Sequence, residues 1–171
     1  EMLICSTGVI GVELPMSLID SGIKQIQPSR DGGHALARAM MTTDTRTKET
    51  AVTFELDGRQ VYLGGVSKGS GMIHPNMATM LCFVTTDAAV EQDYLRSILP
   101  DISDSTLNML DIDGDTSTND TLLIMANGAA KGQTIVEGSE EAALFQEAVT
   151  RLCISLAKDV MADGEGVSKV F

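Results

Sequence analysis

The segment AVTFELDGRQVYLGG, residues 51–65, predicts a β-hairpin, and the rest of the fold is built around it. Two runs rich in β-branched and aromatic residues flank Asp57-Gly58, a dipeptide whose residues readily adopt the positive φ angles of a type I′ turn. We therefore expect strands over residues 51–56 and 60–65, joined by a tight turn.

The hairpin leads directly into KGSGMIHPNMATML, residues 68–81. Gly69, Gly71 and Pro75 interrupt this segment, so neither a continuous helix nor a central strand accounts for it. It is predicted to be a shaped loop, and such loops often hold one functional side chain in place. The candidate side chain is Thr79, which directly precedes a strand-like run over residues 80–84.

The remaining hydrophobic patterns alternate helices with strands within one domain. They predict short helices after Pro15 and over residues 34–41, strands over residues 2–5 and 122–126, and a long helix over residues 140–161. Ser139 is expected to cap the long helix, and one face of that helix carries its apolar residues, namely Leu144, Phe145, Ala148, Val149, Leu152 and Leu156. The fold class is therefore α/β, with sheets covered by helices.

Composition limits the possible partners. The 171 residues are 43% hydrophobic, and 12 basic against 24 acidic residues give a net charge of -12, which disfavours nucleic acid and anionic membrane surfaces. The three cysteines, Cys5, Cys82 and Cys153, stand far apart in apolar runs, which indicates reduced core thiols. With no membrane-length apolar run and no visible signal peptide, we expect a cytoplasmic protein.

Two motifs suggest particular functions, but each departs from the full pattern that the function requires. GVSKG, residues 65–69, matches the G-x-S-x-G elbow that exposes a nucleophilic serine, here Ser67, but glycines and a proline follow where a helix should begin. DIDGDTSTND, residues 111–120, carries carboxylates spaced as in a calcium loop, but it has Thr116 at the sixth place and Leu122 at the twelfth. We expect a hydrogen-bonded turn there, and neither His34 nor His74 has metal-spaced partners.

Thr79 suits a different kind of nucleophile. A threonine hydroxyl needs a base, and its own α-amino group can serve once the preceding peptide bond is cut. The small Ala78 would leave that carbonyl accessible, and a free α-amine has a pKa of about 7.7–8.0, close to working pH. On spacing alone, an ordinary β-branched strand residue remains the alternative.

KGSGMIHPNMATML resembles the self-cleavage and nucleophile motif of the ornithine acetyltransferases, the bifunctional glutamate N-acetyltransferases of cyclic arginine biosynthesis. Other stretches are similar to family motifs in family order: CSTGVIG at residues 5–11, MTTDT at 41–45, GDTSTNDT at 114–121 and DGEGVSK at 163–169. The resemblance implies an αββα sandwich and a single catalytic core over residues 1–171, a central fragment of the family's length. Residues 1–78 would end an α subunit and residues 79–171 would begin a β subunit.

The resemblance also implies roles for particular residues. Thr79 would be the nucleophile, freed by cleavage between Ala78 and Thr79, with the Thr7 hydroxyl and the Gly8 N–H forming the oxyanion hole. The residues lining the substrate site would be Thr45, Lys68, Thr79 and Glu165. By charge, Lys68 suits a substrate carboxylate and Glu165 suits an ammonium group.

The implied reaction moves an acetyl group from N-acetylornithine to glutamate through an acetyl-threonine intermediate, with ping-pong kinetics. It requires no metal or organic cofactor, and acetyl-CoA is an alternative donor. Family members form α/β heterodimers that associate further, and their C-terminal segment adds an asparagine and a hydroxyl residue that have no counterpart here. Two alternatives therefore stay open, a non-catalytic remnant that keeps the fold and a serine hydrolase using Ser67.

Overall fold

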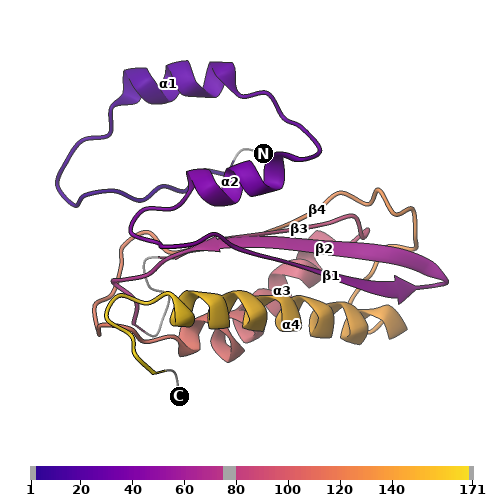
Figure 1. Ribbon diagram of the computed structural model, residues 1–171. Helices are drawn as coiled ribbons and strands as arrows, with labels where there is room; N and C mark the ends of the chain where they lie inside the picture. Colours follow the sequence, from indigo (N-terminus) through magenta and orange to yellow (C-terminus); the bar gives the residue numbers. More distant parts are fainter. Residues whose placement is uncertain (1–2, 75–79, 170–171) are drawn as a thin grey trace.

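The computed structural model describes residues 3–74 and 80–169, and it places four strands in one sheet with the order β1-β2-β3-β4 (Figure 1). β1 and β2 are antiparallel, as are β2 and β3, whereas β3 and β4 are parallel. Helices α3 and α4 lie against one side of the sheet, and α1 and α2 lie on the other side. The predicted α/β class is confirmed.

The hairpin forms where the sequence predicts it. β1 (Lys48–Leu56) and β2 (Arg59–Lys68) pair residue for residue from the turn outward. Asp57 and Gly58 have φ angles of 49° and 70°, as a type I′ turn requires. Both strands continue beyond their predicted bounds at the end away from the turn, so β2 reaches the start of the glycine-rich segment.

β3 (Leu81–Thr86) and β4 (Thr121–Ala126) confirm the two other predicted strands to within about two residues. The crossover between these parallel strands contains α3 (Gln92–Ser105) and the short 3₁₀ helix η1 (Leu107–Met109). α3, which contains Pro100, was not predicted from the sequence.

The core lies between the sheet and the two helices α3 and α4. α4 (Glu140–Ala162) has the predicted apolar face, and its residues Phe145, Val149, Leu152 and Leu156 are fully buried. Two details were wrong. Leu144 is 41% exposed, because it lies off the buried stripe, and Ser139 occupies the N-cap position without making a side-chain capping hydrogen bond.

The N-terminal third packs much less closely. α1 (Met16–Gln25) and α2 (Gly32–Ala39) confirm the predicted short helices, but α1 has no buried residue. The strand predicted over residues 2–5 was wrong where it can be described: residues 3–5 have no regular secondary structure, and Leu3 and Ile4 are 65% and 86% exposed. Residues 3–5 pair with none of the described strands, so this apolar segment does not extend the sheet.

Two of the three cysteines lie in the core, as the sequence predicts. Cys82 and Cys153 are buried free thiols, whereas Cys5 lies outside the core and is half-buried. Burial raises the pKa of Cys153 to about 12, and Cys82 is shifted in the same direction. None of the helices in the described part of the chain has the length and apolar character needed to span a bilayer.

Candidate active site

A buried ion cluster joins three separate parts of the chain. Lys48, the first residue of β1, is 1% exposed, and its Nζ lies 2.5 Å from Asp44 Oδ1 and 2.6 Å from Asp163 Oδ2. Asp44 lies in the loop before β1, and Asp163 is the C-cap residue of α4. A buried charge needs partners of the opposite sign, so this ammonium ties the loop and the helix end together.

Asp44 also holds the chain next to Lys68. Its carboxylate accepts the backbone N–H of Gly69 at 2.7 Å and that of Thr42 at 3.0 Å. Burial alone would raise the pKa of Asp44, but the Gly69 N–H, Lys48 and the Thr42 N–H outweigh it and lower that pKa. An ionised Asp44 therefore fixes the backbone immediately after Lys68.

Asp163 holds Thr45 in the same way. Thr45 donates its backbone N–H to Asp163 Oδ2 at 3.0 Å and its hydroxyl to Asp163 Oδ1. Burial opposes ionisation of Asp163, yet the bonds from Lys48 and Thr45 lower its pKa to about 2. One carboxylate thus sets both the backbone and the hydroxyl of a predicted substrate-site residue.

Lys68 is the last residue of β2, pairs with Leu81 of β3, and is 3% exposed. Burial lowers the pKa of its ammonium, and so does the positive charge of Lys48, whereas Asp44 and Asp120 act in the opposite direction. Asp120 in turn accepts the N–H of Met80 at 2.8 Å. The Lys68 ammonium therefore lies in a buried region in which the charges of Asp44 and Asp120 oppose the effects of burial and of Lys48.

Glu165 reaches the same loop from the C-terminal side. Its backbone N–H donates to the Ser70 carbonyl at 2.7 Å, and the Ser70 hydroxyl lies 2.6 Å from the Thr43 hydroxyl. A Cβ built on Gly71 would lie 3.1 Å from Glu165 Cδ, so the glycine lets the carboxylate pack against the loop. Asp44 of the ion cluster and Glu165 therefore both hold the loop that follows Lys68.

The other predicted site residues are placed differently. Thr7 and Gly8 lie in the N-terminal segment, and among the described contacts no hydrogen bond links either of them to Thr45, Lys68 or Glu165. Ala78 and Thr79 lie outside the described residues.

The serine elbow predicted as an alternative has the wrong geometry. Ser67 lies inside β2, opposite Cys82, and is 1% exposed rather than presented at a turn. Residues 111–120, by contrast, form the predicted hydrogen-bonded turn, in which Gly114 N–H donates to Asp111 at 3.1 Å and Asp115 N–H donates to Asp113 at 3.2 Å.

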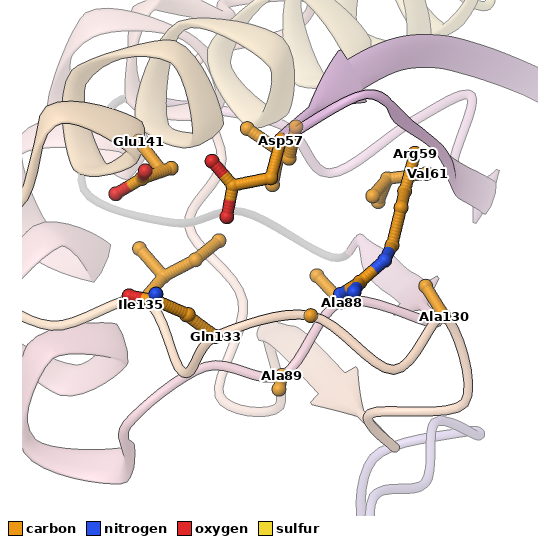
Figure 2. Close-up of a pocket in the computed structure, with 11 residues that line it drawn as sticks. Asp57, Arg59, Val61, Ala88, Ala89, Ala130, Gln133, Ile135 and Glu141 are labelled. Atoms are coloured by element: carbon orange, nitrogen blue, oxygen red, sulfur yellow. The ribbon is translucent and has the colours of Figure 1, made fainter.

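Two hollows lie away from the ion cluster. A groove of about 770 Å³ runs between α2 and the sheet, where Val66, Phe83 and Leu123 contribute to its floor. A small pocket of about 20 Å³ lies at the opposite end of β2 from Lys68, beside the hairpin turn, and Figure 2 shows Asp57 and Glu141 around it. That volume holds about one water molecule, which is too little for an amino-acid substrate.

The sequence reasoning missed the central cation of the cluster. Asp44 and Asp163 lie within MTTDT and DGEGVSK, two motifs that carry the family resemblance, and that proximity is a signal that could have found them. Lys48 had no such signal, because a lysine at the start of a strand normally faces solvent.

Fold and site define an α/β protein in which charged loops converge on a buried ion cluster at one end of a mixed sheet. The chain belongs to the ArgJ family, whose family model matches residues 1–171. The resemblance noted from the motifs is thereby confirmed.

Several relatives share nearly the whole chain. The arginine biosynthesis bifunctional protein ArgJ of Lactococcus lactis subsp. lactis is 51% identical over 170 residues, which are 99% of this chain and 43% of the relative. That of Dehalococcoides mccartyi is 48% identical over 99% of this chain and 42% of the relative. A crystal structure of ArgJ from Bacillus halodurans aligns with a TM-score of 0.49 and 41% identity, covering 51% of this chain and 41% of that one. The chain spans less than half the length of the curated relatives it matches.

Proposed function

We propose that the protein transfers an acetyl group from N-acetylornithine to glutamate in arginine biosynthesis. Membership of the ArgJ family supports the pathway, since the relatives are named for arginine biosynthesis. The observation that carries the proposal is the set of contacts around the loop after Lys68: Asp44 of the ion cluster binds Gly69, Glu165 binds Ser70, and Thr45 binds Asp163 of the same cluster. Thr45, Lys68 and Glu165 would bind a substrate that carries both a carboxylate and an ammonium group.

The two charged residues would bind opposite ends of the substrate. Lys68 would pair with the α-carboxylate of N-acetylornithine, because its buried ammonium makes a charge-assisted hydrogen bond more favourable than it is in water. Glu165 would receive the distal ammonium. With both ends held, the acetyl carbonyl would be presented in one orientation, which is worth a large part of the barrier for acyl transfer.

The nucleophile in this proposal is Thr79. Its hydroxyl first attacks the Ala78 carbonyl, the peptide C–N bond breaks as the ester forms, and water hydrolyses that ester to leave residues 1–78 and 79–171 as separate subunits. The free α-amine of Thr79 then takes the hydroxyl proton during attack on the acetyl carbonyl and delivers a proton to the departing ornithine amine. Glutamate's amine finally takes the acetyl group from the threonine ester.

The oxyanion hole, the lack of a cofactor and the kinetics are proposed from the family resemblance. Thr7 and Gly8 would donate to the oxyanion of each tetrahedral intermediate, which would require the N-terminal segment to approach the ion cluster. The reaction needs no metal or organic cofactor, and acetyl-CoA is a possible second donor. The kinetics would be ping-pong.

We also propose that the chain forms part of an αββα sandwich and assembles into an oligomer. The apolar floor of the 770 Å³ groove, with Val66, Phe83 and Leu123, is the side of the sheet on which a second β-layer would pack. The two subunits would form an α/β heterodimer that associates into a larger oligomer in the cytoplasm. A net charge of -12 is consistent with small-molecule substrates rather than nucleic acid or a membrane surface.

Mass spectrometry tests the proposal directly. The protein expressed from its complete gene should appear as two fragments that part between Ala78 and Thr79. Incubation with N-acetylornithine and no acceptor should leave one acetyl group on the peptide that begins with Thr79. The Thr79→Ala variant should stay uncut and unacetylated. An uncut wild-type protein without the adduct would instead support the non-catalytic remnant.

A further inference from the structure

The acidic turn at residues 111–120 contacts Met72, Ile73 and Met80, which stand on either side of the proposed cleavage point in the sequence. β3 and β4 pair with a constant offset of 40 residues, beginning with Leu81 opposite Thr121. Immediately before this ladder, Thr121 N–H donates to the Met80 carbonyl at 3.0 Å, and Met80 N–H donates to Asp120 Oδ1 at 2.8 Å. The same offset therefore extends upstream of the strands.

Contacts between the two segments are also present before residues 75–79. Ile112 N–H donates to the Ile73 carbonyl at 2.8 Å, a separation of 39 residues, and Ile73 N–H donates to Asp113 Oδ1 at 3.0 Å, a separation of 40 residues. Met72 N–H also donates to Asp113. One carboxylate thus binds the backbone before residues 75–79, and a second carboxylate binds the backbone after them.

We propose that Asp113 and Asp120 are positioning residues for the self-cleavage at Ala78-Thr79 and for the acetyl transfer that follows, because they fix the chain on both sides of that peptide bond. This inference rests on the proposed function. The turn then has a role in the reaction. Its carboxylates are spaced as in a calcium loop, but calcium binding is not the role proposed here.

The ionisation of the two carboxylates differs. Burial opposes the charge on Asp113, but the backbone N–H groups of Met72, Asp115 and Ile73 outweigh it and lower the pKa of Asp113. Burial raises the pKa of Asp120, although the hydrogen bonds from Met80 and Ser117 and the charge of Lys68 act in the opposite direction. The charge of Asp120 opposes the lowering of the Lys68 pKa, so Asp120 acts on the Lys68 ammonium as well as on the Met80 backbone.

Geometry explains why such anchors would matter. The Met80 N–H belongs to the peptide bond that joins Thr79 to Met80, so Asp120 binds the peptide unit directly after the proposed nucleophile. Intramolecular attack on a peptide carbonyl depends steeply on orientation, and a displacement of about 1 Å can lower a rate about 10²-fold.

The test compares matched variants of the protein expressed from its complete gene, with the rate of fragment appearance followed by intact mass. Asp113→Ala and Asp120→Ala should each slow cleavage by about 10- to 100-fold, the effect of losing a hydrogen bond to a charged group. Asp115→Ala removes a charge from the same turn without removing an acceptor of residues 72–80, and it should cleave at the wild-type rate. Asp120→Asn should recover much of the lost rate, because its amide oxygen still accepts the Met80 N–H.

A stability control separates positioning from folding. Ile98 is buried in α3, and Ile98→Ala should lower stability by emptying core space while keeping the wild-type cleavage rate per folded molecule. Cleavage slowed as much in Ile98→Ala as in Asp120→Ala would overturn the inference, because loss of stability would then suffice. Normal cleavage in both aspartate-to-alanine variants would also overturn it and leave the proposed function standing. An uncut wild-type protein would overturn both.

Discussion

Lys48 and Asp163, 115 residues apart in the sequence, form a buried ion pair with 2.6 Å between Nζ and Oδ2. The pair connects the first residue of β1 to the end of α4, and both side chains are almost completely removed from water. Since Asp44 completes the cluster on the other side of the same ammonium, removal of Lys48 would leave two buried carboxylates without their cation.

Replacing this lysine should therefore be costly. Lys48→Met keeps the length of the side chain and removes the charge, and we expect the free energy of unfolding to fall by about 3–5 kcal/mol. Denaturant titration measures the loss. Lys24→Met, which breaks the exposed pair with Asp20, is the control and should cost less than about 1 kcal/mol. Equal losses in the two variants would show that the buried cluster contributes no more to the free energy of unfolding than the exposed pair does.

Acid should weaken the cluster in a defined range. The pKa of Asp163 falls from its ordinary 3.8 to about 2 in the folded protein, so its contribution to stability is complete above pH 4 and is lost as the pH falls toward 2. The pKa of Asp44 is shifted in the same direction. The stability difference between wild type and Asp163→Asn should shrink by about 2 kcal/mol between pH 5 and pH 2. A difference that does not change over this range would contradict the assignment.

Two adjacent glycines in β2 should respond differently to the same substitution. A Cβ on Gly65 would lie 2.6 Å from Leu152 Cδ2 and 3.0 Å from Leu156 Cδ1, both in the packed core. Gly65→Ala should therefore lower stability by about 1–3 kcal/mol through overpacking. Gly64→Ala is the matched control, because its Cβ would meet only Thr85 Oγ1 at an ordinary 3.7 Å. Thermal unfolding of both variants distinguishes the two positions.

Substrate recognition should depend on Lys68 and Glu165 in different ways. Lys68→Met should raise KM for N-acetylornithine by about 10- to 100-fold, because the substrate carboxylate loses a charge-assisted partner. Glu165→Gln should weaken recognition of the distal ammonium and leave cleavage at Ala78-Thr79 intact. Steady-state kinetics with N-acetylornithine and intact mass give the two readouts. Lys158→Met, an exposed lysine on α4, is the control, and a KM for it matching that of Lys68→Met would point to a general charge effect.

Local signals were sufficient for most of the elements. Asp57-Gly58 required a tight turn, Pro15 stood just before the first helix, and the apolar stripe of residues 140–161 identified the helix that covers the sheet. α3 was missed because Pro100 interrupts its pattern, although Tyr94, Ile98 and Ile102 follow the four-residue spacing of a buried face.

Long-range features could not be predicted in this way. The apolar run at residues 3–5 has the composition of a strand, but a strand forms only where another strand is available for pairing. The parallel order of β3 and β4 and the burial of Lys48 depend on residues that are tens of positions apart. The family resemblance, not the charge pattern, predicted that Lys68 and Glu165 share one site, whereas the carboxylates that hold the neighbouring loops became visible only in three dimensions.

Two carboxylate anchors couple the lengths of two segments, because Asp113 accepts the Ile73 N–H and Asp120 accepts the Met80 N–H. Ile73 to Met80 and Asp113 to Asp120 span the same number of residues between the same two anchors, so a change of length in one segment would change its match with the other. Deleting one residue from either segment would force a mismatch into the β3–β4 ladder or detach one anchor. A compensating deletion in the other segment would restore the match, so natural or engineered changes of length here should occur in pairs.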